Sequence, residues 1–293
     1  MTTATFLAPT RWEDALVEKA ARPDAVPIAG GTDLMVAVNR GGPRPDPLLD
    51  LTRVDGLADW SQHGGRLRIG AAVPYARLVR ELAALAPGLA AAARTVGSPQ
   101  IRNRGTVGGN LASASPAGDC HPPLLAAGAV VEVASVRGKR QIPIGDFFTG
   151  VKRSALVPDE LIAAVELPVA PGPQEFAKVG TRNAMVIAVC SVAVGLDPTA
   201  GTVGTGLGSV APTPRRAPEA EAFAAAELAG RGLWESRAPI PDPVAVRFGE
   251  LVAAAAAPID DVRGTAAYRR HALAVLGRRV LLRAWSGYRT GAP

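Results

Sequence analysis

The residues best suited to chemistry lie in two glycine-rich segments that carry hydroxyl, amide and carboxylate groups at close spacing. The longer one, RNRGTVGGNLAS, covers residues 102–113, and Asp119 follows a few positions later. The shorter one, AGGTDL, covers residues 29–34. Glycine leaves backbone N–H groups bare and tolerates positive φ, so each segment is a candidate cradle for a phosphate. Together, the two segments suit the two phosphates of one dinucleotide.

Each segment has a plain structural alternative. The sequence contains no GxxxxGK[ST], and neither segment reads GxGxxG with an acidic residue ~20 positions later, so the simple phosphate motifs are excluded. Gly30 to Asp33 offers successive N–H donors where a strand is predicted to enter a helix, whose N-terminus favours an anion. An ordinary turn has the same composition. The presence of two such segments, each with Gly-Gly beside hydroxyl and amide groups, favours a binding site.

Composition narrows the function further. The chain has 293 residues, of which 48% are hydrophobic and 20% charged, as in a globular protein of two or three domains. Its net charge is +6, but the basic residues are scattered and aromatic residues make up 4%, which argues against nucleic-acid binding. Two cysteines without CxxC spacing exclude a self-contained zinc or iron-sulfur site. The N-terminus shows no signal pattern and no apolar run approaches ~18 residues, so we expect a cytoplasmic protein without a membrane span.

Hydrophobic periodicity places the shorter glycine segment, residues 29–34, in a small α/β unit. A capping box at Thr10 and Glu13 predicts the first helix, and residues 26–29 form a strand that enters the segment. A helix over residues 33–40 and a strand over 47–51 complete a parallel unit that spans residues 1–55.

The longer glycine segment, residues 102–113, falls in a unit that spans residues 56–170 and is richer in antiparallel strands. Below, residues 29–34 are called the first segment and residues 102–113 the second segment. We predict strands at 66–70, 129–133, 140–144 and 160–167, and helices at 74–85 and 87–96. The Pro/Gly cluster at 168–173 is the best domain boundary in the chain. A third unit, residues 174–288, reads as three strands near 175–180, 186–196 and 202–210, followed by helices near 218–229, 243–257 and 264–287. The fold class is therefore α+β.

The two segments in this order resemble the FAD-binding medium subunit of molybdenum hydroxylases, a family that includes the xanthine dehydrogenase and carbon monoxide dehydrogenase flavoproteins. AGGTDL at 29–34 and TVGGNLASASPAGD at 106–119 carry the resemblance, and KVGTR at 178–182 and GSVAPTP at 208–214 support it. The likeness covers essentially the whole chain. It implies the two-subdomain FAD-binding fold of the vanillyl-alcohol-oxidase/PCMH type, followed by a C-terminal antiparallel sheet backed by helices.

The resemblance also implies a set of cofactor contacts. Both segments are expected to wrap the FAD pyrophosphate and ribityl chain, while Asp119 accepts hydrogen bonds from hydroxyl groups. Lys178, one of four lysines, is expected near the flavin, where its charge would stabilise the reduced anion, and Ile162 is expected to pack near the ring. The full set is Pro27, Ile28, Ala29, Gly30, Gly31, Thr32, Asp33, Leu34, Gly105, Thr106, Gly108, Gly109, Asn110, Ser113, Gly118, Asp119, Ile162 and Lys178.

Each of these single residues keeps a structural alternative. The alternative for Asp119 is a turn residue, for Lys178 an edge lysine that extends into solvent, and for Ile162 a core residue. His121 beside Cys120 is a candidate for covalent flavin attachment. We expect neither a catalytic residue nor a metal ligand in this chain.

By resemblance, a large subunit with the molybdenum cofactor oxidises a purine or another small substrate. Electrons then pass through [2Fe-2S] clusters in a small subunit to the FAD of this chain, and on to NAD or another acceptor. The family often has an acidic residue shortly after the arginine equivalent to Arg182, whereas this chain reads RNAMVI, so the acceptor stays open. A stand-alone flavin oxidoreductase of the same fold is the alternative enzyme. A binding module whose glycine segments are only turns is the alternative outside enzymes.

Overall fold

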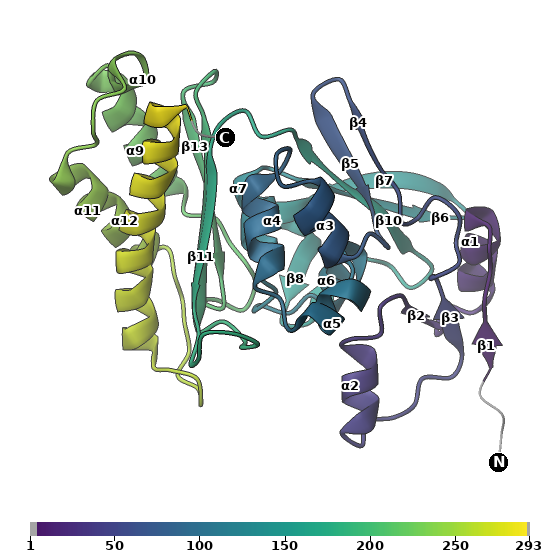
Figure 1. The fold of residues 1–293 in the computed structure, drawn as a ribbon. Coiled ribbons are helices and arrows are strands. Elements are labelled where there is room, and N and C mark those ends of the chain that lie inside the picture. The colour runs from purple at the N-terminus through teal and green to yellow at the C-terminus, as the bar shows by residue number, and fades with distance from the viewer. Residues whose placement is uncertain (1–4, 292–293) are drawn as a thin grey trace.

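The computed structural model describes residues 5–291 and consists of three parts, each with its own sheet (Figure 1). The α+β fold class predicted above is confirmed. No helix within residues 5–291 has the length and apolarity needed to cross a membrane.

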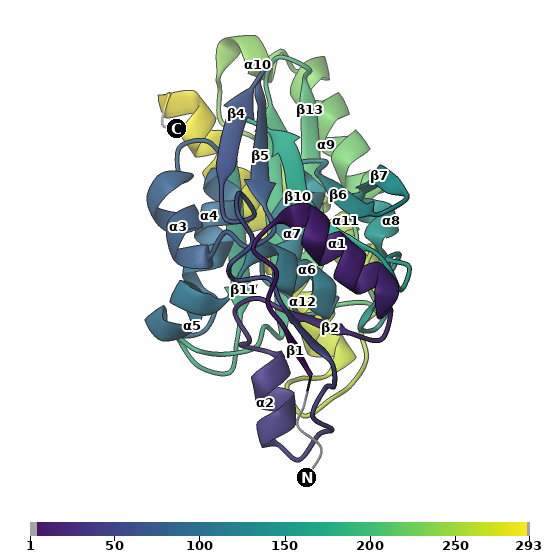
Figure 2. The same cartoon turned by 90° about the vertical axis from the view of Figure 1, so that its right-hand side faces the viewer.

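The first part is a three-stranded parallel sheet with strand order β1-β3-β2. Its elements are β1 (Phe6–Leu7), α1 (Trp12–Ala21), β2 (Val26–Ile28), α2 (Leu34–Asn39) and β3 (Leu48–Asp50). The predicted capping box is wrong, because α1 is capped by Arg11 without a side-chain hydrogen bond, and Thr10 lies outside the helix. Helix α2 buries none of its residues and projects from the lower end of the molecule in both views (Figures 1 and 2).

The second part is a five-stranded antiparallel sheet with strand order β4-β5-β10-β6-β7. Its strands are β4 (Trp60–His63), β5 (Arg66–Gly70), β6 (Val130–Ser135), β7 (Gly138–Pro143) and β10 (Leu161–Pro168). Its helices and a small hairpin are α3 (Tyr75–Glu81), α4 (Pro87–Arg94), α5 (Pro99–Arg104), α6 (Val107–Ser113), α7 (His121–Ala126), α8 (Ile144–Phe147), β8 (Phe148–Gly150) and β9 (Arg153–Ser154).

The third part is an antiparallel sheet, β11-β12-β13, with four helices after it in sequence. Its elements are β11 (Gln174–Val179), β12 (Cys190–Asp197), β13 (Thr202–Gly208), α9 (Pro218–Gly230), α10 (Leu233–Ser236), α11 (Asp242–Ala254) and α12 (Ala266–Thr290). Helices α9 and α12 contact the sheet from its own domain, and Figure 1 shows α4 and α7 of the second part on the other side of the sheet.

Helix α7 lies directly on the backbone of β13. A Cβ atom at Gly204 would be 2.1 Å from the carbonyl oxygen of Ala126, and one at Gly206 would be 1.9 Å from that of Pro122. Both distances are far below van der Waals contact, so these two positions exclude any side chain. The second and third parts therefore meet backbone to backbone.

Buried side chains form two clusters. One is formed mainly by the first and second parts, as with Leu49, Leu67 and Leu161, and also takes in Phe176 and Ala193 of the third part. The other belongs to the third part and includes Phe248 and Trp285. The predicted domain limits at residues 55 and 170 stay predictions; the packing joins the first two parts through one core and gives the third its own.

Candidate cofactor site

The two glycine segments meet in the fold. A Cβ atom at Gly30 would be 1.9 Å from the carbonyl oxygen of Arg104, so a side chain at this position would collide with the backbone of the second segment. The Ser113 hydroxyl donates a hydrogen bond to Asp33 Oδ2 at 2.8 Å, across 80 residues of sequence. The pairing inferred from composition is thus present in space.

The second segment is a helix rather than the glycine turn that the sequence suggested. Thr106 caps α6, and its Oγ1 accepts a hydrogen bond from Gly109 N at 3.0 Å. Gly108 allows close packing, because a Cβ there would be 2.7 Å from Ala71 O. Of the glycines predicted to contact the cofactor, Gly31 alone has a positive φ, 71°. Most of these glycines are therefore needed because neighbouring atoms pack too close for a Cβ, and not because the backbone has a positive φ.

A largely apolar cleft of ≈ 80 Å³, open to solvent, lies between β2, α6 and β10. Five predicted contacts line it, namely Pro27, Ala29, Gly108, Gly109 and Ile162. The sequence reasoning missed its other residues, which are Leu51, Leu57, Ala71, Ala72, Ala112, Leu156, Glu160 and Leu161. Apart from Glu160 these are small or aliphatic, and nothing in the sequence separates them from core residues.

Glu160 is the charged residue of the cleft lining, and its carboxylate is fully engaged. Arg140 Nε and Nη2 donate to its two oxygens at 2.7 and 2.8 Å, and Val157 N donates at 3.0 Å. The hydrogen bond from Arg140, the largest cause, holds the pKa of Glu160 below its usual value. Glu160 is therefore ionised and paired at neutral pH.

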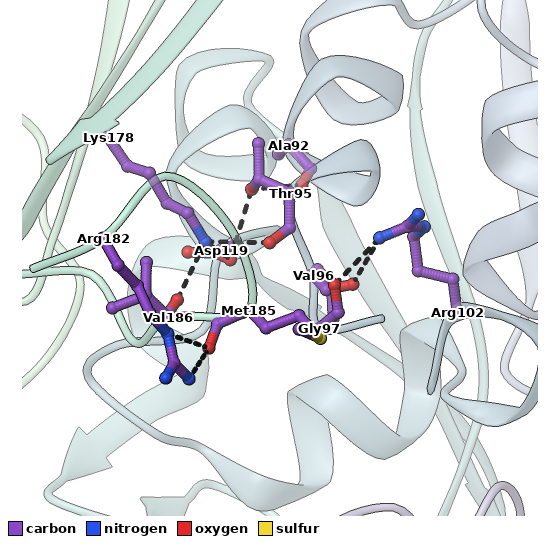
Figure 3. Close-up of polar contacts among 10 residues, drawn as sticks. All are labelled: Ala92, Thr95, Val96, Gly97, Arg102, Asp119, Lys178, Arg182, Met185 and Val186. Atoms are coloured by element: carbon purple, nitrogen blue, oxygen red, sulfur yellow. Dashed lines mark hydrogen bonds and ion pairs between the residues drawn. The ribbon is translucent and has the colours of Figure 1, made fainter. Parts of the chain in front are cut away.

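Asp119 and Lys178 form a buried ion pair at 2.6 Å, with side chains 9% and 10% exposed (Figure 3). Burial raises the pKa of Asp119, and the Lys178 ammonium opposes that rise. Lys178 lies on the edge strand β11, but its side chain is buried and does not extend into solvent, and Asp119 does more than terminate a turn. The sequence reasoning placed both at the cofactor but missed their contact with each other, which spans 59 residues.

Three buried side-chain oxygens within the described residues have no hydrogen-bond partner. One is Ser209 Oγ, and the other two are Asn110 Oδ1 and Asp119 Oδ1. A buried acceptor left unsatisfied costs ~1–3 kcal/mol. Asn110 and Asp119 belong to the predicted contact set, and FAD carries donors on its ribityl chain, its ring system and its adenine. The residues present fit that cofactor.

His121 lies beneath this site. Its ring is fully buried, 4.5 Å from the Phe148 ring, and Nε2 lies 3.1 Å from the carbonyl oxygen of Asn110. Since that oxygen can only accept, Nε2 carries the proton, and burial lowers the pKa of His121 to about 4. Covalent attachment of a flavin at His121 stays a prediction.

Gly118 makes room for this ring, because a Cβ there would be 2.3 Å from His121 Cε1. Gly105 packs in the same way against Tyr75, whose ring carbon Cε2 would be 2.9 Å from a Cβ. Both glycines therefore allow an aromatic ring to pack against the backbone next to the second segment. Ile28, Thr32 and Leu34 flank Gly31 and are half-buried.

Within residues 5–291, no three His, Cys, Asp or Glu side chains gather as a metal site would require.

Comparison with known proteins gives the class of this molecule. Residues 2–170 match the family described as the FAD binding domain in molybdopterin dehydrogenase, and residues 175–284 match the CO dehydrogenase flavoprotein C-terminal domain. The chain belongs to the FAD-binding medium subunits of the molybdenum hydroxylase family. The predictions of an FAD-binding fold, FAD as cofactor and an oxidoreductase flavoprotein are confirmed.

Relatives with similarity over nearly the full length carry several different substrate names. The chain is 33% identical over 286 residues to the nicotine 6-hydroxylase medium subunit of Paenarthrobacter nicotinovorans, covering 95% of this chain and 96% of the relative. It is 30% identical over 279 residues to a putative xanthine dehydrogenase FAD-binding subunit of Escherichia coli, covering 92% and 91%. Quinoline 2-oxidoreductase from Pseudomonas putida 86 contains a chain of the same structure, with TM-score 0.88, 28% identity and 98% of both chains covered.

Proposed function

We propose that this chain binds one FAD along the two glycine segments and transfers electrons within a heteromeric molybdenum hydroxylase. The observation that carries the proposal is the contact of Gly30 with the Arg104 backbone, which brings the two glycine segments together. Two residues of the predicted contact set, Asn110 and Asp119, also have a buried oxygen without a partner. The apolar cleft suits a planar ring, and Asp119 and Asn110 suit polar donors of the same ligand.

When bound, FAD supplies the redox chemistry, and the protein supplies binding, orientation and electrostatics. Gly30 and Gly109 leave backbone accessible at the contact of the segments, and the aliphatic cleft walls exclude water. Asp119 accepts a hydrogen bond through its free oxygen.

The remainder of the assembly follows the family. A [2Fe-2S] small subunit would deliver electrons from a large molybdenum subunit to this FAD, and NAD or another acceptor would take them up. A purine or a related N-heterocycle is the proposed substrate, since relatives are named for nicotine and xanthine. We propose a cytoplasmic location for the complex.

Gly109→Val tests the FAD site directly. A Cβ at Gly109 would lie 3.1 Å from Thr106 Oγ1, which would have to shift by a few tenths of an ångström, and the rest of the valine side chain would fill cleft space that the ligand needs. We expect purified variant to lack flavin absorbance and to lose at least ~100-fold in FAD affinity by fluorescence titration. Gly145→Val is the matched control, because Gly145 is also in a short helix and has open space around it. Normal flavin content in Gly109→Val would contradict the proposed site.

Purification of the native complex separates the subunit from the stand-alone enzyme. The subunit assignment predicts that molybdenum and iron co-purify with the tagged chain, in addition to flavin. A lone active chain that contains flavin but neither metal would support the stand-alone oxidoreductase instead.

A further inference from the structure

Helix α2 is apolar and lies outside the core. Its sequence is LMVAVN, residues 34–39, and none of these residues is buried. Met35 and Val36 are each 43% exposed. Within residues 5–291 no other helix or strand packs extensively against α2, and both views show it projecting from the lower end of the molecule (Figures 1 and 2). The helix thus presents adjacent apolar side chains to solvent.

Local features of residues 33–40 do not explain why α2 is helical. Isolated helices shorter than ~12 residues are marginal in water, and most helical stability in proteins comes from the packing of an apolar face. α2 has 6 residues, and its N-cap, Asp33, makes no side-chain capping bond. Val36 and Val38 are β-branched, which lowers helix propensity. The helix therefore needs packing that residues 5–291 do not supply.

Helix α1, in the same part of the molecule, shows the ordinary arrangement. It buries Ala15 and Leu16 against the core, and its one exposed large apolar side chain is Val17, at 58%. Single exposed apolar side chains are normal on soluble proteins, whereas adjacent ones that form a patch mark an interaction site. Val17 is of the first kind, and the side chains of α2 are of the second.

Three exposed arginines lie around this apolar helix. Arg40 and Arg44 follow α2 directly, and Arg104 ends α5, where its carbonyl oxygen would be 1.9 Å from a Cβ at Gly30. None of the three forms an ion pair with another of the described residues. Arginine and methionine are both enriched in protein interfaces.

The carboxylates nearest in sequence are engaged elsewhere. Asp33 Oδ2 accepts a hydrogen bond from Ser113, and Asp46 Oδ1 accepts one from Thr5 N at 2.7 Å. The positive charge beside α2 is therefore left for a partner. A surface that complements it has an apolar centre bordered by carboxylates.

Met35 connects α2 to the first glycine segment. Met35 N donates a hydrogen bond to Gly31 O at 3.0 Å, and a Cβ at Gly31 would be 3.4 Å from Met35 Cγ. A chain that covers α2 therefore lies beside the segment along which we propose that FAD binds. Within the proposed assembly, the subunit that exchanges electrons with FAD has to come closest to this segment.

We propose that α2 and its neighbouring arginines dock the [2Fe-2S] subunit of the complex. The apolar side chains of α2 pack against an apolar patch of that subunit, and carboxylates around the patch pair with Arg40, Arg44 and Arg104. A stable interface buries about 800 Å² on each partner, so α2 supplies its centre and the adjoining surface supplies the remainder. This inference rests on the proposed function.

A crosslink in the native complex identifies the chain that covers α2. The photo-crosslinker p-benzoylphenylalanine replaces Val36 in the tagged full-length chain, or Val17 as the control, and mass spectrometry identifies the product. We expect a crosslink from position 36, and none from position 17, to the chain with the cluster-ligating cysteines. A product with the molybdenum subunit or with a second copy of this chain would overturn the proposal, as would the absence of any product.

Charge substitutions measure how much the surface contributes. Val36→Asp adds a carboxylate in the first turn of α2, where the helix dipole favours it, so the helix is kept. We expect iron per tagged chain to fall at least ~tenfold in Val36→Asp and by less in Arg44→Glu. Val17→Asp is the matched control and should keep its iron. Flavin content should be normal in all three, and normal iron in both Val36→Asp and Arg44→Glu would contradict the docking site.

Failure of the proposed function would look different. A wild-type chain without flavin would contradict the FAD site itself. A wild-type chain that holds flavin but co-purifies with neither iron nor molybdenum would contradict the assignment as a subunit. The docking site alone is wrong if the wild-type chain carries iron and the changes in α2 leave that iron bound.

Discussion

The cleft and the Asp119–Lys178 pair divide the work of recognition in different ways. The cleft is aliphatic, and its one carboxylate, Glu160, is fully paired with Arg140. The buried pair is charged and leaves Asp119 Oδ1 unsatisfied. β2 beside the cleft and β11 with Lys178 lie on opposite sides of α6 in Figure 1. In the proposed FAD site, the cleft would select the ligand by shape and the buried pair would recognise its polar groups.

Asp119→Leu should give the largest loss of stability. A small loss would contradict the contrast between an apolar cleft and a buried, charged pair. The substitution leaves the Lys178 ammonium buried without its counter-ion, which we expect to cost about 3–5 kcal/mol of unfolding free energy. Urea denaturation measures the loss. Asp119→Leu combined with Lys178→Met should recover most of the stability but not the FAD affinity. A stable single variant would show that the pair is solvated and not buried.

His121, which lies beneath α6, should give an intermediate and pH-dependent effect. Its folded pKa of about 4 is below the ordinary value near 6.5, so the unfolded chain binds more protons between these pH values. Stability should thus fall by about 2–3 kcal/mol as the pH drops from 6.5 to 4. His121→Leu should lack this part of the slope in urea titrations at several pH values. Equal slopes in both proteins would show that the ring is accessible to solvent.

Arg140→Gln should give the smallest effect, because Arg140 is about half exposed. In the wild type the pKa of Glu160 is lowered by Arg140, so its contribution is complete above the ordinary glutamate value of about 4.3 and is lost as the pH falls through the folded pKa. The variant should lose less stability below pH ~4.3. At pH 7 we expect a change of about 1 kcal/mol or less and nearly normal FAD affinity. A large loss of affinity would assign polar recognition to the cleft as well.

Periodic patterns in the sequence predicted the main elements. Strands β5, β6, β10, β11 and β13 and helices α9, α11 and α12 lie where apolar spacing placed them, within a few residues. Strand β4 was missed because WSQH, residues 60–63, has no apolar alternation and lies at the edge of its sheet. Short helices such as α5 and α7 were missed because prolines near their N-termini look like loop residues.

The site was predictable in part. Hydroxyl, amide and glycine groups identified both segments, but Gly108 and Gly109 suggested a turn where the chain forms a capped helix. Cleft residues such as Leu51 and Ala72 carry no local signal, since only tertiary packing leaves them beside a cleft. The bond between Asp119 and Lys178 depends on how two domains meet, which no short pattern records.

The backbone contact between α7 and β13 constrains protein engineering. Gly204 and Gly206 give the third part a flat surface onto which the carbonyl groups of Ala126 and Pro122 fit. A chimera that joins this FAD-binding part to the C-terminal domain of a relative would need residues without side chains at both positions. Alanine at either place would already separate the domains and shift every residue they contribute jointly. Whether an exchanged C-terminal domain fits therefore depends on whether it has glycine, and not alanine, at the positions of Gly204 and Gly206.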